Sequence, residues 1–219
     1  MSYPTYHAAY LHLVGRPCLV VGGGNIAVEK ITLLIDAGAV VTVIAPKVLD
    51  SIRDWHEAGA VEWICREFVP EDALPAFLVI GATDDMAVNR EVYLAGNRLN
   101  RLANSVDDPD NCNFIFAAMV RQGPMQVAVS SAGCSPALAQ KIRNRIAEEI
   151  MEPGMGDLAD FLGSWRPAVK KRLVGYGVRK QFWERVLASA VPELMKSGNR
   201  IGADEEMGHL LDDAWRLAS

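Results

Sequence analysis

The spacing of apolar residues changes near the start of the chain, around a run of three glycines. Residues 18–21 form a short apolar run that is typical of a buried strand. After the glycines at 22–24, apolar residues recur at the three- and four-residue spacing of one helix face, up to residue 35. Gly38 then stands where a helix ends, and residues 40–44 form a β-branched run. The pattern predicts a strand, a glycine turn, a helix and a second strand.

Strand and helix patterns continue to alternate as far as residue 106. The run at 77–82 is continuously apolar, as expected of a strand that is covered on both faces. Such alternation predicts an α/β domain with a Rossmann-like, doubly wound parallel sheet. Beyond the second strand we expect strands at 61–65, 77–82 and 101–106, and helices at 50–58 and 86–99.

The pattern changes after residue 112. Two β-type runs, at 113–120 and 124–131, are separated by three polar or glycine residues and predict an antiparallel pair. Ser135 suits a helix N-cap and Pro136 the first helical position, so a helix should run to about residue 151. A linker and several helical patterns follow. We therefore expect a Rossmann-like domain, a small α+β segment and a C-terminal helical domain, over residues 1–112, 113–152 and 153–219.

The glycine run matches the G-x-G-x-x-G/A fingerprint of dinucleotide-binding proteins. Gly22 allows the tight turn, Gly24 lets a pyrophosphate approach the backbone, and Ala27 permits close packing of helix and strand. The N–H groups that open the helix, from Asn25 and Ile26 onward, would face the phosphates. Because a strand precedes the turn and a helix follows it, dinucleotide binding is favoured over a purely structural turn.

Ligands of doubly wound sheets bind outside the carboxyl ends of the strands. The second strand ends without an Asp or Glu to bind ribose hydroxyls, and without an Arg for a 2′-phosphate, although Lys47 could bind one. This favours NAD over NADP as the cofactor. The residues expected around the cofactor crevice are Gly22, Gly24, Asn25, Ile26, Pro46, Lys47, Thr83, Asp84, Asn104 and Val106.

Composition and charge exclude several classes of protein. The formal net charge of −5 argues against nucleic acid as a partner. No segment approaches the ~20 apolar residues that cross a bilayer, and the first residues do not resemble a secretory signal. The cysteines are scattered, without a CxxC pair or a histidine at ligand spacing. We therefore expect a cytoplasmic protein with reduced thiols, no membrane segment and no resident metal.

Four motifs occur in one order along the chain: the glycine turn with Lys30, residues 82–85, residues 104–109 and the serine-rich segment 130–139. Together they resemble the precorrin-2 dehydrogenase / sirohydrochlorin ferrochelatase family, which is also the N-terminal module of siroheme synthases. The resemblance covers residues 8–150 strongly and the helical tail loosely. Asn25 and Ser105 depart from the acidic residue and the valine that are more usual in the family.

The resemblance implies NAD-dependent oxidation of precorrin-2, a tetrapyrrole, to sirohydrochlorin in siroheme or cobalamin biosynthesis, by a homodimer built through residues 113–150. It gives Asp107 the acid/base role. Ser131 is a second candidate catalytic residue, for positioning the substrate, and Ser130 and Ser135 are candidates for binding its carboxylates. Some members also insert Fe²⁺, and this ferrochelatase activity, with Fe²⁺ or Co²⁺ as substrate, stays open here. Trifunctional siroheme synthases also carry a methyltransferase module, and the sequence shows none, so we expect methyltransferase activity to be absent.

Two other functions remain compatible with the sequence. A non-catalytic NAD-binding regulatory domain needs the Rossmann core but has no use for the serine-rich segment. An NAD(P) reductase of a small carbonyl substrate would normally have a catalytic Lys, His or Tyr, and none stands out. Asp107 could equally form a turn before Pro109, and the basic residues between 166 and 185 could be a solvated helix face.

Overall fold

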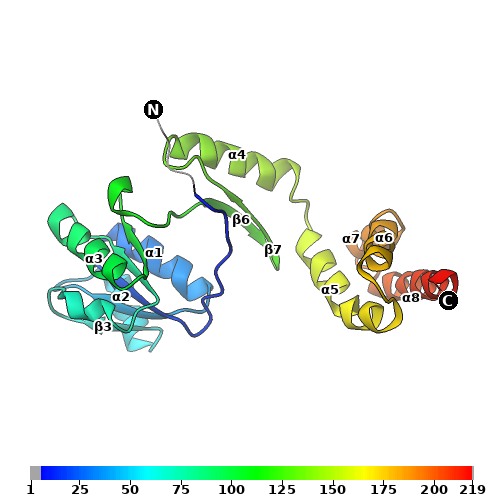
Figure 1. Cartoon of the computed structure of the whole chain (residues 1–219), viewed down its shortest axis with the longest axis horizontal. Coiled ribbons are helices and arrows are strands. Elements are labelled where there is room, and N and C mark those ends of the chain that lie inside the picture. Colours follow the sequence, from blue (N-terminus) through cyan, green and yellow to red (C-terminus); the bar gives the residue numbers. More distant parts are fainter. Residues whose placement is uncertain (1–5, 219) are drawn as a thin grey trace. The chain divides into compact units, whose positions relative to one another are not determined.

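The computed structural model describes residues 6–218, and the chain divides into two compact units, Met1–Phe116 and Ala117–Ser219. Residues 1–5 and 219, which belong to the first and last predicted domains, lie outside the described residues. Figure 1 shows the elements of both units, and each unit is described here by itself.

The first unit is built on a five-stranded parallel sheet with the order β3-β2-β1-β4-β5. The order reverses between β1 and β4, where doubly wound sheets bind their ligands. The predicted Rossmann-like fold is therefore confirmed. The strands are β1 (Pro17–Val21), β2 (Val40–Ile44), β3 (Val61–Ile64), β4 (Leu78–Gly81) and β5 (Leu102–Ser105). The helices are α1 (Asn25–Asp36), α2 (Asp50–Glu57) and α3 (Met86–Arg98), with short 3₁₀ turns η1 (Pro70–Ala73) and η2 (Pro109–Asn111).

Both faces of this sheet are buried, which explains why its central strands are continuously apolar. Side chains alternate along β1, so Cys18 and Val20 join one core while Leu19 and Val21 join the other. The first core includes apolar residues of α1 and α2, and the second includes those of α3 and η1. Helices on both faces leave the carboxyl edge of the sheet as the place for a ligand.

The second unit begins with an antiparallel pair, β6 (Ala118–Gln122) and β7 (Met125–Val129), as predicted. The first strand of the pair starts at residue 118 and not at 113. Asn113 bonds instead to the edge strand β5, where its N–H donates to the Ala103 carbonyl and its Oδ1 accepts from the Ala103 N–H. Phe114 and Phe116 pack against the first core. Residues 113–116 therefore complete the Rossmann unit.

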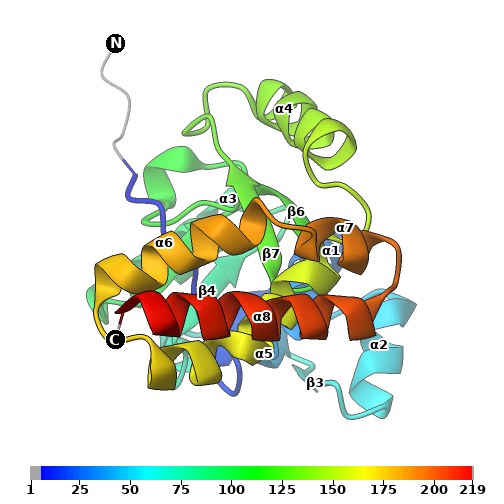
Figure 2. The ribbon, with the colours of Figure 1, turned by 90° about the vertical axis from the view of Figure 1, so that its right-hand side faces the viewer.

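Five helices follow in the second unit: α4 (Pro136–Glu149), α5 (Met155–Arg172), α6 (Tyr176–Leu187), α7 (Val191–Lys196) and α8 (Arg200–Ala218). Helix α4 packs on both strands of the hairpin. The later helices enclose an apolar core that contains Phe161, Phe182 and Met207, and α6 lies beside α8 (Figure 2). Among the described helices, none combines the length and apolarity needed to span a bilayer.

Candidate active site

The glycine turn after β1 is built from three glycines with different constraints. Gly22 has φ +127°, and a Cβ there would lie 2.2 Å from the Ala82 carbonyl oxygen. A Cβ on Gly23 would lie 2.2 Å from the Lys47 carbonyl oxygen. At Gly24 a Cβ would meet nothing among the described residues within 4 Å. The first two glycines thus pack against the neighbouring loops, and the third faces open space.

That open space fits the pyrophosphate of a dinucleotide. Gly24 is the N-cap of α1 and supplies no side-chain hydrogen bond to it. The first N–H groups of a helix have no acceptor within the helix, and here no side chain of the N-cap residue accepts from them. Together with the helix dipole they form a site for an anion directly beside Gly24.

The loop after β2 lies against the glycine turn. The Leu49 N–H donates to the Gly23 carbonyl over 3.0 Å, and this contact holds the exposed Pro46 and Lys47 beside the turn. Trp63 supports the loop from β3, because its indole N–H donates to the Ala45 carbonyl over 3.0 Å. Sequence reasoning gave no role to Trp63, since an isolated aromatic residue in a strand is usually only core.

The loop after β4 is fixed by Asn89, a buried polar residue of α3 that the sequence analysis missed. Its Oδ1 accepts from the Thr83 N–H over 3.0 Å and lies 2.8 Å from the Thr83 hydroxyl, and its Nδ2 donates to the Thr83 carbonyl over 2.9 Å. The neighbouring Asp84 is exposed, while Asp85 caps α3. Asn89 therefore holds the loop that carries two of the predicted cofactor residues.

Replacing Asn89 by Leu should destabilise the first unit by about 1–3 kcal/mol, because the Thr83 N–H and carbonyl would lose their partner. Urea unfolding of the variant measures this change, with the exposed Asn25→Leu as a control that should unfold like the parent. Equal stability of the Asn89 variant and the parent would contradict the role given to this residue.

The turn after β5 presents Asp107 at the same edge of the sheet. The Val106 N–H donates to the Gly81 carbonyl over 2.9 Å, and the Asp108 N–H donates to the Ser105 carbonyl over 3.2 Å, closing the turn. Asp107 has φ +59°, in the left-handed region that is uncommon for residues other than glycine. Its side chain is exposed.

Cys112 braces the Asp107 turn from behind. Its Sγ lies 3.2 Å from the carbonyl oxygens of both Ser105 and Asp108, and it accepts from Asn104 Nδ2 over 3.3 Å. Burial raises the pKa of the Cys112 thiol, which keeps the donating proton in place. Asn104 also donates to the Phe114 carbonyl over 3.0 Å, so this predicted cofactor residue has a structural contact of its own.

The three predicted serines lie in the second unit, before and at the start of α4. Ser130 Oγ accepts from the Ala132 N–H over 3.0 Å, Ser131 Oγ accepts from the Ser135 N–H over 2.9 Å, and Ser135 caps α4 through the Leu138 N–H. Ala132 and Gly133, within this turn, both have positive φ angles, of 52° and 83°. Each hydroxyl oxygen accepts within the turn, so each O–H can still donate outward.

The structure thus brings the glycine turn, the Lys47 loop, the Thr83 loop and the Asp107 turn to one edge of the first sheet. Within residues 6–218, no group of three or more His, Cys, Asp or Glu side chains could hold a metal ion.

Three family models match the chain one after another. Residues 9–118 match a model described as putative NAD(P)-binding. Residues 122–149 match the central part of sirohaem biosynthesis proteins, and residues 154–211 match the sirohaem synthase dimerisation region.

The chain belongs to the precorrin-2 dehydrogenase / sirohydrochlorin ferrochelatase family, the N-terminal module of siroheme synthases. The resemblance predicted from four sequence motifs is therefore confirmed. Siroheme synthase 1 of Yersinia enterocolitica is 39% identical over 202 residues, which cover 92% of this chain and 43% of that protein. Siroheme synthase of Neisseria meningitidis is 36% identical over 211 residues, which cover 96% of this chain and 44% of that protein. The chain thus spans a little under half the length of these curated relatives.

One solved structure in this family covers nearly the whole chain. The protein described as SirC, precorrin-2 dehydrogenase, is 25% identical, with a TM-score of 0.75 over 95% of this chain and 100% of its own. The predicted cofactor residues and Asp107 lie in the part of the chain that matches the NAD(P)-binding model. The three serines lie in the part that matches the central model. The match to the sirohaem synthase dimerisation region begins at residue 154, after residues 113–150, through which the sequence analysis expected the homodimer to form.

Proposed function

We propose that this chain oxidises precorrin-2 to sirohydrochlorin, with NAD⁺ as the hydride acceptor, in siroheme biosynthesis. The observation that carries the proposal is the succession of three matching models, in one order, over residues 9–118, 122–149 and 154–211. The likeness to a solved precorrin-2 dehydrogenase supports it. A regulatory NAD-binding domain would need the first of these models only.

The first unit supplies the residues that would hold the cofactor. The open space at Gly24 and the uncapped N–H groups from Asn25 and Ile26 onward suit the pyrophosphate. Pro46 and Lys47 would lie beside the adenosine ribose, at the end of β2. Thr83, Asp84, Asn104 and Val106, at the ends of β4 and β5, would border the nicotinamide half. When bound, NAD⁺ supplies the acceptor for a hydride.

NAD⁺ is expected to bind more tightly than NADP⁺, because no arginine follows β2 in residues 45–49 and the exposed Lys47 is the one cation in that stretch. Lys47→Asp should widen the preference by roughly tenfold, or about 1.4 kcal/mol, since a carboxylate would accept from the ribose and repel a 2′-phosphate. Calorimetric titration with both nucleotides tests this. A parent chain that binds NADP⁺ more tightly would refute the assignment.

Asp107 is proposed as the base. Oxidation removes a hydride and a proton from the macrocycle, and a carboxylate at this position can accept the proton as the hydride departs. The exposed side chain stands on a turn that lies directly beside β4, at the cofactor edge of the sheet.

The serine segment is proposed to position the substrate. Precorrin-2 carries many carboxylates, and the outward O–H groups of Ser130, Ser131 and Ser135 can donate to them. The positive end of the α4 dipole lies in the same segment and also favours an anionic group. These groups bind carboxylates that do not change in the reaction, so they would fix the orientation of the ring and take no part in proton transfer.

The chain is expected to be a homodimer. The match to a sirohaem synthase dimerisation region and the exposed apolar residues of the second unit, such as Ile142 and Ile150, support this. Two-fold dimers are the commonest assembly, and burial of apolar side chains drives their formation. Sedimentation equilibrium at micromolar concentration should give twice the chain mass of 23.9 kDa. A single species at the chain mass would refute the dimer.

Metal insertion is an additional activity that one carboxylate could support, because chelation also requires removal of protons, here from pyrrole nitrogens. Fe²⁺ or Co²⁺ would then be a second substrate. Anaerobic incubation of the chain with sirohydrochlorin and either metal separates the two cases. Insertion faster than in a protein-free control adds ferrochelatase activity, and an equal rate leaves a dehydrogenase alone.

The proposed function is tested against its rivals by turnover. Precorrin-2 and NAD⁺ should yield sirohydrochlorin with the chain and not without it. A panel of small ketones and 2-hydroxy acids should give no reaction with either nucleotide. Turnover of the panel without turnover of precorrin-2 would favour a reductase of small carbonyl compounds, and binding of NAD⁺ with no turnover of either would favour a regulatory domain.

A further inference from the structure

A cavity of about 730 Å³ lies between α5 and α6 in the second unit. Six of the residues that line it are basic or aromatic, and together they define what we call the basic groove: Arg166, Lys170, Tyr176, Arg179, Lys180 and Trp183. Its volume is within the range of sites for small molecules and cofactors. None of these residues takes part in the cofactor edge of the first unit.

The groove follows from the spacing of residues on its two helices. Arg166 and Lys170 are four residues apart on α5, and Tyr176, Arg179 and Trp183 recur at three- and four-residue intervals on α6. This spacing places each set on one face of its helix. The buried Val169 and Phe182 of the same helices point into the apolar core, so the core itself holds the two basic faces toward the groove.

The positive charge in the groove is largely uncompensated. No carboxylate within the described residues pairs with Arg166 or Lys170. Arg179 donates to the Leu173 carbonyl over 3.1 Å, which fixes its guanidinium without neutralising it. Lys180 lies 3.7 Å from Glu184, the one carboxylate among the residues that line the cavity, but both side chains are 62% exposed, and such pairs are weak. This concentration of cations stands out in a chain with a net charge of −5.

Aromatic rings provide the second feature of the groove. Tyr176 is 78% exposed, so the face of its ring is open to a ligand. Trp183 is half-buried, and its contact with Phe182 at 5.1 Å fixes the plane of the indole. Fixed or exposed rings beside cations favour a flat, conjugated ligand with anionic groups at its edge, because the rings stack on its face while the cations bind its edge.

We propose that the basic groove binds a planar, polycarboxylated macrocycle, namely the tetrapyrrole of the proposed reaction, and in this the inference rests on the proposed function. The oxidation removes two hydrogens from the ring and leaves every carboxylate in place. A site that recognises carboxylates and a flat ring therefore holds reactant and product alike. The groove gives the second unit a ligand-binding role that its match to a dimerisation region does not include.

A second copy of the chain is a poorer occupant of the groove. Interface cores between protein copies are depleted of charge, and lysine especially is under-represented there. Two-fold symmetry would also bring the groove cations of one copy toward those of the other wherever the groove lies near the axis. An anionic ligand satisfies the same groups without this repulsion.

The test uses uroporphyrin, a stable and highly carboxylated ring, and mesoporphyrin, a sparsely carboxylated one, titrated into the full chain by calorimetry. Uroporphyrin should bind more tightly, and its affinity should fall as salt is added. The double variant Arg166→Gln/Lys170→Gln should weaken uroporphyrin binding at least tenfold. Both side chains are exposed, so the fold should be kept. Lys170→Gln alone should show a smaller loss and serves if the double variant does not fold.

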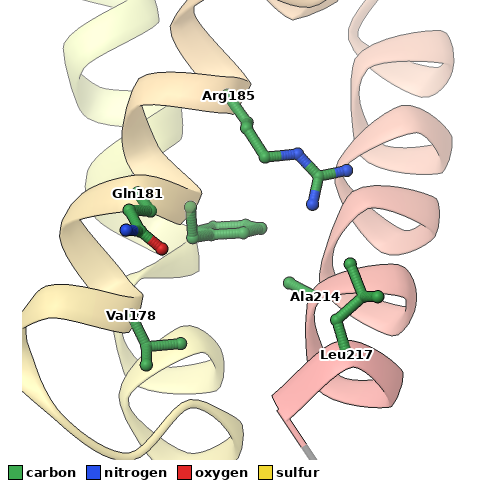
Figure 3. Close-up of a pocket in the computed structure, with 6 residues that line it drawn as sticks. Val178, Gln181, Arg185, Ala214 and Leu217 are labelled. Carbon is green, nitrogen blue, oxygen red and sulfur yellow. The ribbon is translucent and has the colours of Figure 1, made fainter.

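Arg185→Gln is the matched control. Arg185 belongs to the same helix, α6, but it reaches toward α8, where it lines a separate cavity of about 200 Å³ with Ala214 and Leu217 (Figure 3). Its loss removes one positive charge, as Lys170→Gln does, but from a different face. The control should bind uroporphyrin like the parent.

Three outcomes would overturn the groove: unchanged affinity in the double variant, an equal loss in the Arg185 control, or a change of oligomeric state in the double variant that marks the groove as an interface between copies. The proposed function fails separately. Uroporphyrin binding that depends on Arg166 and Lys170, in a chain that does not oxidise precorrin-2, would keep the groove and reject the dehydrogenase. Oxidation of precorrin-2 by a chain in which these residues have no effect on uroporphyrin binding would keep the dehydrogenase and reject the groove as a binding site.

Discussion

Asp107→Asn is expected to lower the turnover of precorrin-2 by about 10²–10⁴-fold while NAD⁺ binding stays unchanged. The amide keeps the shape of the carboxylate but accepts no proton. Asn is also among the few residues that tolerate the left-handed φ of +59° at this position, so the turn should be kept. Steady-state kinetics with precorrin-2 and calorimetry with NAD⁺ measure the two quantities.

Asp110→Asn provides the control for this change. Asp110 is an exposed carboxylate three residues further along the same loop, in η2. The same chemical change there should leave turnover near that of the parent. If the Asp107 variant also turns over at nearly the parent rate, Asp107 is a turn residue and another group accepts the proton.

Gly24→Asp is expected to weaken NAD⁺ binding by at least about 100-fold, or about 2.8 kcal/mol, without loss of stability. Gly24 has φ −87°, which any residue can adopt, and a Cβ would meet nothing among the described atoms within 4 Å. The variant should therefore fold, and its carboxylate would stand where the pyrophosphate must lie. Calorimetric titration with NAD⁺ and urea unfolding test the two parts.

Substitution of the neighbouring Gly23 is expected to lower stability, in contrast to substitution of Gly24. Gly23→Ala would place a Cβ 2.2 Å from the Lys47 carbonyl oxygen, so it should cost about 1–3 kcal/mol of stability through displacement of the loop. Gly24→Ala, by comparison, should unfold like the parent. Unchanged NAD⁺ affinity in the Gly24→Asp variant would remove the cofactor site from this turn.

Much of the first unit could be predicted from the sequence, because its signals are local. Three glycines between a buried strand and an amphipathic helix determine the βαβ unit, and continuous apolar runs mark strands that are covered on both faces. The cofactor site could be predicted at the ends of these strands, because parallel strands bring their carboxyl ends to one edge of the sheet. The expected cytoplasmic location stays a prediction.

What sequence reasoning missed depends on contacts distant in the chain. The side chain of Asn113 pairs with β5, so a run that looked like a new strand completes the first unit. Asn89 and Cys112 hold the Thr83 loop and the Asp107 turn through hydrogen bonds that have no sequence period. From the sequence alone, the basic residues of α5 and α6 could equally be solvated helix faces. Only the structure shows that residues of both helices line one cavity.

The central claim is that a hydride passes from the tetrapyrrole to nicotinamide on this chain. The most direct measurement is one anaerobic time course that records NADH and sirohydrochlorin together, starting from purified chain, precorrin-2 and NAD⁺. The two products should appear at equal rates and in equal amounts, and neither should form when the chain or NAD⁺ is omitted. Sirohydrochlorin formed at the same rate without NAD⁺, or no product with both present, would contradict the account.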